Sequence, residues 1–246
     1  MRTLIYLVRV KKPHLHIVTG KQMKTEISSE TVKMYGSDAG AIVIGIAAAE
    51  DLCSAPDGFR PADVLPECRS VIVLGVPHPK EALSDIDEYT ENRNAMLTAM
   101  TEMSKEVAKR IKADGYKTKA ISATGGRWAE VGGRKEHFGH ISLKHAAEAA
   151  GLGVIGRNCL LTSPQYGNLL WLSAVLTDAE LTPDGKIGSD MCSGCSKCVE
   201  ACPSGALDDP VSFGKKGCSG FFAMEGGKLR IKCFLCRTVC PHCRGL

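Results

Sequence analysis

Eight cysteines near the end of the chain fall into two runs whose spacing suits iron–sulfur clusters. The first run is Cys192-x2-Cys195-x2-Cys198-x3-Cys202-Pro203. The second starts at Cys218 and, after a long gap, continues as Cys233-x2-Cys236-x3-Cys240-Pro241. The first spacing is typical of bacterial ferredoxins, in which one loop offers three thiolates to one cubane and the fourth thiolate binds the other cluster. The sequence therefore predicts two 4Fe–4S clusters and transfer of single electrons.

The ligands of the two predicted clusters are divided across the runs. We expect one cluster to bind Cys192, Cys195, Cys198 and Cys240. We expect the other to bind Cys202, Cys218, Cys233 and Cys236. Cys243 competes with Cys218, because the gap from Cys218 to Cys233 is far longer than two residues. We favour Cys218, since Cys243 lies beyond the Cys-Pro that normally closes the motif.

Zinc and disulfides are the alternatives for these thiols. A zinc ribbon needs four ligands, and it has no use for the third and fourth cysteines of each run or the proline that follows. Disulfides suit short secreted chains with an export signal, which this sequence does not resemble. The isolated cysteines, Cys53, Cys68 and Cys159, are expected to be inert.

Composition sets broad bounds. The chain has 246 residues, of which 44% are hydrophobic, enough for one large domain and a small one. A net charge of +4 and 5% aromatic residues give no case for nucleic-acid binding. No apolar stretch is long enough to cross a membrane. The apolar run 4–8 is too short for a signal peptide, so residues 1–28 are expected to form a leader or an extra strand of a cytoplasmic protein.

The residues before the cysteine runs predict a mixed α/β domain. Apolar, β-branched segments predict buried strands at Ala41–Ala47, Ser70–Val76, Tyr116–Thr124 and Asn168–Asp178. The turn Pro183–Gly185 marks the expected domain boundary. We therefore expect an α/β domain over residues 29–186 and a small ferredoxin-like domain with two clusters over residues 187–246.

Helices are expected at two places in the α/β domain. The first runs from about Asn92 to Asp114, because apolar residues recur there at helical spacing: Met96, Met100, Met103, Val107 and Ile111. The second is Leu143–Ala150, capped by Ser142 and stopped by Gly151. The charged, glycine-rich stretch Arg127–Phe138 is expected to be a loop.

Three glycines follow the second predicted helix: Gly151, Gly153 and Gly156. Their G-x-G-x-x-G spacing matches a dinucleotide fingerprint, but that motif needs a strand before it and a helix after it, and here the order is reversed. Two interpretations stay open. One is a helix end followed by a tight loop; the other is a backbone surface that lies flat against a large planar cofactor, where only glycine allows close approach.

Two segments carry a resemblance to a known family. Residues 142–181, SLKHAAEAAGLGVIGRNCLLTSPQYGNLLWLSAVLTDAEL, followed by the cysteine runs, resemble the core of the epoxyqueuosine reductases and the related reductive dehalogenases. Residues 58–79, GFRPADVLPECRSVIVLGVPHP, are similar to an earlier part of that family. The resemblance implies a nitroreductase-like α/β domain that holds a corrinoid (cobalamin), with electrons passing from the clusters to cobalt.

The resemblance also implies which residues contact the cofactor. The candidates are Lys144, His145, Gly153, Gly156, Arg157, Asn158 and Tyr166. Only one of Lys144 and His145 can face it, because neighbours on a helix point about 100° apart. For His145, helix packing or a solvated position is the alternative. For Arg157 and Asn158 it is a salt bridge, and for Tyr166 simple packing.

The sequence departs from the family in two places. The family's proton-donating aspartate would fall near His137, in EHFGH, so we expect His137 or His140 to donate the proton, since histidine titrates near neutral pH. A loop histidine that faces water is the alternative. The helical-repeat extension that would help to hold tRNA does not follow the second Cys-Pro, which makes tRNA a disfavoured substrate.

Three functions are compatible with these features. The first is a corrinoid-linked oxidoreductase. The second is an electron-transfer protein that reactivates the corrinoid of a partner protein, and the third is a flavin-dependent reductase. Basic residues near the clusters predict an acidic electron donor such as a ferredoxin or flavodoxin. These residues are Lys197, Lys215, Lys216, Arg230, Lys232 and Arg237.

Overall fold

The computed structural model describes residues 24, 26–53, 55, 58–123, 126–131, 134–188, 190–208, 218, 222–225 and 228–245. The leader or extra strand predicted for residues 1–28 lies mostly outside the described residues. In the described part, no helix is both long enough and apolar enough to cross a membrane.

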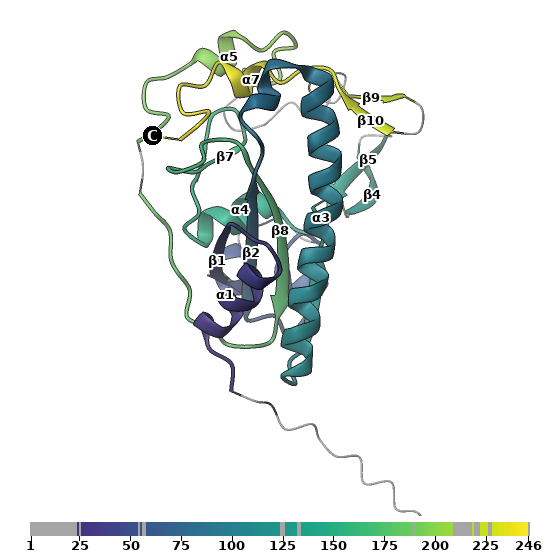
Figure 1. The fold of residues 1–246 in the computed structure, drawn as a ribbon, viewed down its shortest axis with the longest axis vertical. Helices are drawn as coiled ribbons and strands as arrows, with labels where there is room; N and C mark the ends of the chain where they lie inside the picture. Colours follow the sequence, from purple (N-terminus) through teal and green to yellow (C-terminus); the bar gives the residue numbers. More distant parts are fainter. Residues whose placement is uncertain are drawn as a thin grey trace, which may run out of the picture.

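A four-stranded sheet forms the centre of the fold (Figure 1). Its strands lie in the order β1 (Val43–Ala48), β2 (Ser70–Pro77), β8 (Leu170–Thr177) and β3 (Thr118–Ile121). Each neighbouring pair is antiparallel. The strands predicted around β1, β2 and β8 are confirmed, whereas β3 is shorter than the predicted strand. The mixed α/β prediction is thus confirmed, with an antiparallel sheet.

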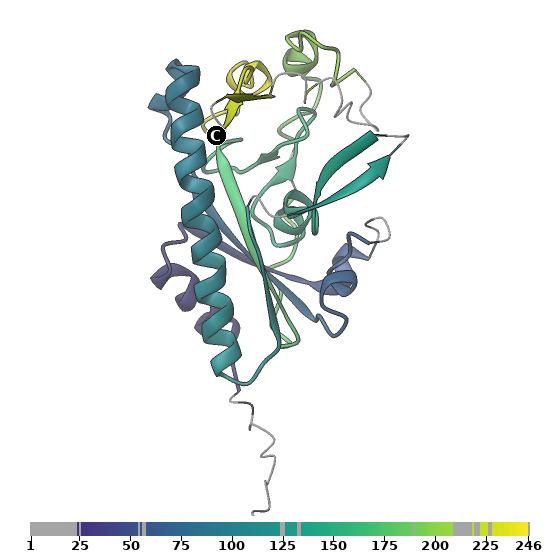
Figure 2. The same ribbon diagram turned by 90° about the vertical axis from the view of Figure 1, so that its right-hand side faces the viewer.

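Strand β2 is buried on both of its faces, as its unbroken apolar sequence predicts. Alternate side chains point to opposite sides of a strand. Val71 and Val73 therefore join the hydrophobic cluster that includes α4 (Leu143–Ala149). Ile72 and Leu74 join the cluster on the other face, which includes α1 (Ser29–Asp38) and α3 (Ile86–Ala113). Figure 2 shows these helices on the two sides of the sheet.

Helix α3 is the longest element, at 28 residues. Its predicted apolar stripe is buried at Met100, Met103, Val107 and Ile111, whereas Met96, at the start of the stripe, is half-buried. It begins at Ile86, six residues before the expected Asn92. Asp85 is the reason: its side chain accepts hydrogen bonds from the N–H groups of residues 87 and 88, both at 2.8 Å, and so caps the helix.

The extra first turns of α3 reach the C-terminal cysteine region (Figure 1). A guanidinium nitrogen of Arg230 lies 2.6 Å from the Asp87 carboxylate. The hydroxyl of Thr90, which is buried, accepts a hydrogen bond from the N–H of Ile231 at 3.2 Å. One helix thus packs on the sheet and also holds the cysteine region.

The loop predicted for Arg127–Phe138 is wrong. The structure has a hairpin there, in which β4 (Gly126–Val131) pairs antiparallel with β5 (Arg134–Gly139). Gly132-Gly133 between the strands is a dipeptide that favours tight hairpin turns, and the stretch before it carries the β-formers Trp128 and Val131. The charged residues suit a hairpin that projects from the body of the fold (Figure 2).

The remaining elements are short. Before the hairpin they are η1 (Ala49–Leu52), α2 (Pro61–Val64) and η2 (Glu81–Ser84). After α4 they are β6 (Val154–Ile155), β7 (Leu161–Thr162), α5 (Lys197–Glu200), β9 (Phe222–Glu225), β10 (Lys228–Ile231) and α7 (Leu235–Thr238). The stretch after β8 packs back on the sheet, where Asp184 accepts a hydrogen bond from the N–H of Ile46 at 2.8 Å.

Replacing Ile72 by alanine tests the importance of the central strand. Ile72 is completely buried, so Ile72→Ala should lower the free energy of unfolding by about 2–5 kcal/mol through lost burial and a new cavity. Urea denaturation followed by circular dichroism under anaerobic conditions measures this. Ile42→Ala is the control, because that side chain is 56% exposed and should change stability by less than about 0.5 kcal/mol. Equal effects would contradict this assignment of the core.

Candidate metal centre and adjoining cavities

The cysteine thiols lie in two neighbouring groups. In the first, Cys198 interacts electrostatically with Cys192 and Cys240, and Cys240 also interacts with Cys192 and Cys195. Burial is the largest cause that raises the pKa of both Cys198 and Cys240, and the neighbouring thiols add to it. These are the four cysteines that the spacing assigns to one cluster.

The second group contains the other four. Burial raises the pKa of Cys218, and interaction with the thiols of Cys202 and Cys233 raises it further. Burial raises the pKa of Cys236 to about 11, with Cys218 and Cys233 again among its neighbours. Cys236 also interacts with Cys198 of the first group, so the two groups adjoin each other.

Backbone N–H groups support one of these thiols. Burial raises the pKa of Cys202, but hydrogen bonds involving Ser204, Ala206 and Leu207 outweigh it and leave that pKa below its ordinary value. N–H groups aimed at a sulfur favour its thiolate, the form that binds metal. In the described part of the chain, no three His, Cys, Asp or Glu side chains lie close enough together to hold a single metal ion. The thiols within each group therefore lie further apart than the ligands of a single metal ion.

Cys243 lies apart from the second group. Burial raises its pKa, and its charged neighbours are Arg237, Cys240, Arg244 and Lys80. Cys218, not Cys243, therefore neighbours the thiols of Cys202, Cys233 and Cys236.

The isolated cysteines have different surroundings. Cys53 is exposed. Burial raises the pKa of Cys68 to about 11, and its thiol donates to the carbonyl of Ser70 at 3.4 Å. Cys159 is not isolated in space, because its thiol interacts electrostatically with that of Cys218.

The segment around Gly156 packs against the cysteine loops. A Cβ on Gly156 would lie 3.2 Å from the sulfur of Cys192. A guanidinium nitrogen of Arg157 donates to the carbonyl of Cys195 at 3.2 Å. The amide nitrogen of Asn158 donates to the carbonyl of Cys236 at 3.3 Å.

The space beside Gly153 is also occupied by the protein itself, since a Cβ there would lie 2.4 Å from the carbonyl oxygen of Thr162. The helix end and tight loop are therefore present, and the close approach at Gly156 is to a cysteine loop.

Residues 166–168 hold the end of the second run. Gly167 has a φ of +58°, and a Cβ there would lie 2.2 Å from the carbonyl oxygens of His242 and Cys243. Tyr166, next to it, is half-buried. Asn168 is buried, and its amide nitrogen donates to the carbonyl of Arg237 at 3.2 Å. No local sequence pattern pairs Asn168 with Arg237, because this contact joins residues 69 positions apart.

A cavity of about 510 Å³ opens beside α4 and the end of β5. Its apolar wall includes Phe59 and Phe138, whose ring centroids are 5.5 Å apart. Its polar wall includes Lys144, His145 and Lys186. Such a volume and mixed lining are typical of small-molecule sites.

The polar residues of this cavity connect to the cysteines. The ammonium of Lys144 donates to the carbonyl of Cys159 at 3.0 Å. Partial burial lowers the pKa of His145, and the charge of Lys144 lowers it further. Ser142 does not cap α4 with its side chain; its hydroxyl is hydrogen-bonded to Nδ1 of His145. Lys144 and His145 therefore both line the cavity, although they are neighbours on one helix.

The two histidines considered as proton donors lie at the end of the hairpin. His137 pairs through its backbone with Trp128 within β4–β5, and its side chain lies outside the described residues. His140 is half-buried just after β5, next to residues 138 and 139 of the cavity wall.

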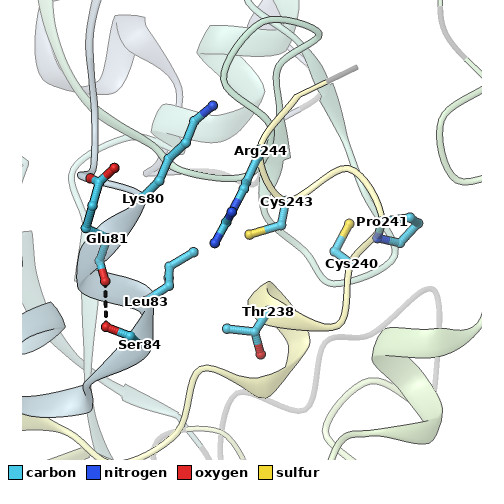
Figure 3. Close-up of a pocket in the computed structure, with 9 residues that line it drawn as sticks. All are labelled: Lys80, Glu81, Leu83, Ser84, Thr238, Cys240, Pro241, Cys243 and Arg244. Carbon is cyan, nitrogen blue, oxygen red and sulfur yellow. Dashed lines mark hydrogen bonds between the residues drawn. The ribbon is translucent and has the colours of Figure 1, made fainter.

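A second cavity, of about 630 Å³, lies between η2 and the C-terminal loop (Figure 3). Lys80, Glu81 and Arg244 provide its charged groups. Cys240 and Cys243 line the side opposite η2. This cavity thus brings two exposed cations next to a thiol of the first group.

Comparisons with known proteins agree with this arrangement. Residues 186–208 match the family model described as a 4Fe-4S binding domain. Epoxyqueuosine reductase of Bacillus subtilis (strain 168) is 37% identical over 118 residues, which are 44% of this chain and 30% of that protein. The chain is thus similar to epoxyqueuosine reductases over this part of its sequence. The resemblance that the sequence predicts is confirmed, although the match spans under a third of that relative's length.

Solved structures show the same fold. A structure of epoxyqueuosine reductase with an epoxyqueuosine-modified tRNA-Tyr stem loop has a TM-score of 0.62 at 23% identity, covering 87% of this chain and 64% of that one. A reductive dehalogenase structure, whose description refers to B12-dependent dehalogenation, has a TM-score of 0.56 at 22% identity. It covers 72% of this chain and 25% of that one.

Gly167→Ala tests the contact that holds the C-terminal loop. The new Cβ would clash with two backbone carbonyls that cannot move like a flexible side chain. We expect the free energy of unfolding to fall by about 2–3 kcal/mol, with loss of bound iron. Gly188→Ala is the control, since nothing lies within 4 Å of its Cβ position. Thermal unfolding and iron analysis of both variants give the comparison, and equal behaviour would refute the contact.

Proposed function

We propose that this protein is an iron–sulfur oxidoreductase that passes single electrons through two 4Fe–4S clusters. The separation of eight thiols into two groups of four is the observation that carries this proposal. The donor set fits, because thiolates are the usual ligands of such clusters. One cluster would be held by Cys192, Cys195, Cys198 and Cys240, and the other by Cys202, Cys218, Cys233 and Cys236.

The organisation of the chain follows from this proposal. Residues 29–186 form a nitroreductase-like α/β domain that binds the electron acceptor, and residues 187–246 form the ferredoxin-like domain. Cluster-binding thiols need a reducing compartment, for which the cytoplasm is the natural choice.

The cavity beside α4 is the proposed site of the electron acceptor, and a corrinoid is the group that the resemblance implies. Lys144, His145 and Lys186 can bind its amide and phosphate groups, and the Phe59–Phe138 pair offers an apolar wall. A corrinoid would supply the strongly reducing centre that acts on the substrate. Gly153, Gly156, Arg157 and Asn158 instead contact the chain itself, and we propose that they position the cysteine loops.

Lys144 and Cys159 connect this cavity to the second group of thiols. Lys144 lines the cavity and donates to the carbonyl of Cys159, whose thiol neighbours that of Cys218. The second cluster is therefore the one nearer the acceptor, and the first cluster is the one nearer the cavity at Cys240. This order gives electrons a direction through the protein.

His140 and His145 are the proposed proton donors at the acceptor site. Burial lowers the pKa of His145, and the charge of Lys144 lowers it further. A neutral imidazole with Nδ1 at the Ser142 hydroxyl can hold its proton on Nε2. His140 is placed next to the cavity wall by β5, and His137 remains a candidate from the sequence.

The substrate class follows from the relatives. Their names indicate epoxyqueuosine reductase, and one structure contains a tRNA stem loop. We propose a reducible small group as the substrate of this chain, carried by tRNA or free.

Metal and cofactor analysis tests the proposed function. The full chain, purified anaerobically, should contain about eight irons, and cobalamin should bind when it is titrated in. The same iron without cobalamin binding would instead support an electron-transfer protein that reactivates a partner's corrinoid. Bound flavin in place of cobalamin would support a flavin reductase. Iron near zero, or zinc in its place, would refute the proposal.

Cys218→Ser and Cys243→Ser test the ligand assignment within the same experiment. Cys218→Ser should lose about half of the iron, because one cluster loses a ligand. Cys243→Ser should keep all of it, since Cys243 lies away from the second group. The reverse result would transfer the ligand role to Cys243.

The cavity at Cys240 is the proposed docking site of an acidic electron donor, such as a reduced ferredoxin or flavodoxin. Its cations, Lys80 and Arg244, are exposed. Lys197, which lies within the first cysteine run, is exposed as well. The residues predicted for this role need one correction. Arg237 is buried, and Arg230 forms an ion pair with Asp87. Lys215 and Lys216 lie outside the described residues, and Lys232 is exposed.

Reversing one charge tests this docking site. Lys80→Glu should slow reduction by an acidic donor roughly tenfold at low ionic strength, because it repels the partner. The difference from the unmodified chain should shrink as salt is added. Lys112→Glu is the control, since it makes the same charge change in the last turn of α3. Stopped-flow reduction kinetics measure the rates, and equal slowing by both variants would contradict the docking site.

A further inference from the structure

Two arginines lie against one tryptophan beneath the cysteine region. The guanidinium carbon of Arg93, from α3, is 5.2 Å from the ring centroid of Trp171, which is on β8. That of Arg237, from α7, is 5.6 Å from the same centroid. Burial is the main cause that lowers the pKa of Arg93, and the charge of Arg237 lowers it further.

Neither guanidinium has a carboxylate partner among the described residues. Arg93 donates from Nη1 to the side-chain oxygen of Asn94 at 2.8 Å, and its buried Nε has no hydrogen-bond partner. Arg237 donates from Nη1 to the side-chain oxygen of Asn168 at 3.5 Å. The indole nitrogen of Trp171 is likewise buried without a partner. Arg237 is buried and Arg93 is half-buried. Charges removed from water are normally paired, so these two cations call for a nearby anion.

The thiols of the cysteine region are in the right place to supply that negative charge. Arg237 lies one residue after Cys236 in the chain. Burial raises the pKa of both Cys236 and Cys243, and the positive charge of Arg237 opposes that rise. Asn168 holds the Arg237 backbone, and its side chain also makes a hydrogen bond that lowers the pKa of Cys240. Cys236 belongs to one group of thiols and Cys240 to the other, so this assembly adjoins both.

We propose that half-buried Arg93 and buried Arg237, held by Trp171 and Asn168, are counter-charges that raise the reduction potentials of the two clusters. The inference rests on the proposed clusters. Four thiolates give each cluster a net negative charge, and reduction by one electron from the donor adds one more negative charge. A cation in a buried place, where salt and water screen it weakly, favours the reduced form. Arginine keeps its charge at every physiological pH, so the effect is permanent.

Replacement by methionine removes each charge and retains an apolar side chain that can pack on Trp171. Redox titration of the anaerobic full chain with its clusters, monitored by electron paramagnetic resonance, gives the midpoint potentials. Arg93→Met and Arg237→Met should both shift them to more negative values, and Arg237→Met should shift them further because Arg237 is the more deeply buried and is next to Cys236 in the chain. Arg237→Lys keeps the charge and should recover most of the shift.

Arg110→Met is the matched control. Arg110 lies on the same helix as Arg93, but near its other end, where it forms ion pairs with Asp38 and Glu106. It should leave the midpoint potentials unchanged. The inference would be overturned if the midpoint potentials of Arg93→Met and Arg237→Met equalled those of Arg110→Met. If Arg237→Met fails to hold iron, Arg93→Met decides alone. An unmodified chain without iron would refute the proposed function itself, which is a distinguishable result.

Discussion

The attachment of the cysteine loops to the sheet domain is the constraint on which the rest of the structure depends. Short loops rich in cysteine have little apolar surface of their own, so another part of the chain must fix their backbone. Here side chains of Arg157, Asn158 and Asn168 donate to backbone carbonyls of residues 195, 236 and 237. Glycines at 156 and 167 allow contact without intervening side chains. The thiols are thereby held in place by a rigid partner.

Local sequence patterns were sufficient to predict the central strands and the short helix before Gly151, whereas the division of the cysteines between two clusters stays a prediction. Each of these depends on spacing within a few residues or on a familiar ligand motif. The start of α3 was missed because its Asp85 cap lies outside the apolar stripe that defines the helix. The hairpin was missed because charge was given more weight than its central glycine pair and its β-forming residues.

The candidate site was harder to predict for a different reason. The partners of Gly156, Arg157 and Asn158 are cysteine loops that lie 36 or more positions away in the sequence. No local pattern encodes such pairs. The Arg93–Trp171–Arg237 assembly is similar, since its three residues come from a helix, a strand and a loop helix that only the fold brings together. A modest net charge of +4 gives no sign of these buried cations.

Helix α3 ties together parts of the molecule that differ in how they are stabilised. At about 1.5 Å per residue, its 28 residues extend for about 42 Å. Its middle and last turns are buried against the sheet, whereas its first turns contact residues 78, 230, 231 and 234. Local opening follows the weaker contacts of a structure. The backbone amides near Thr90 should therefore exchange their hydrogens whenever the cysteine region opens locally. Those near Val107 should exchange only when the whole domain unfolds.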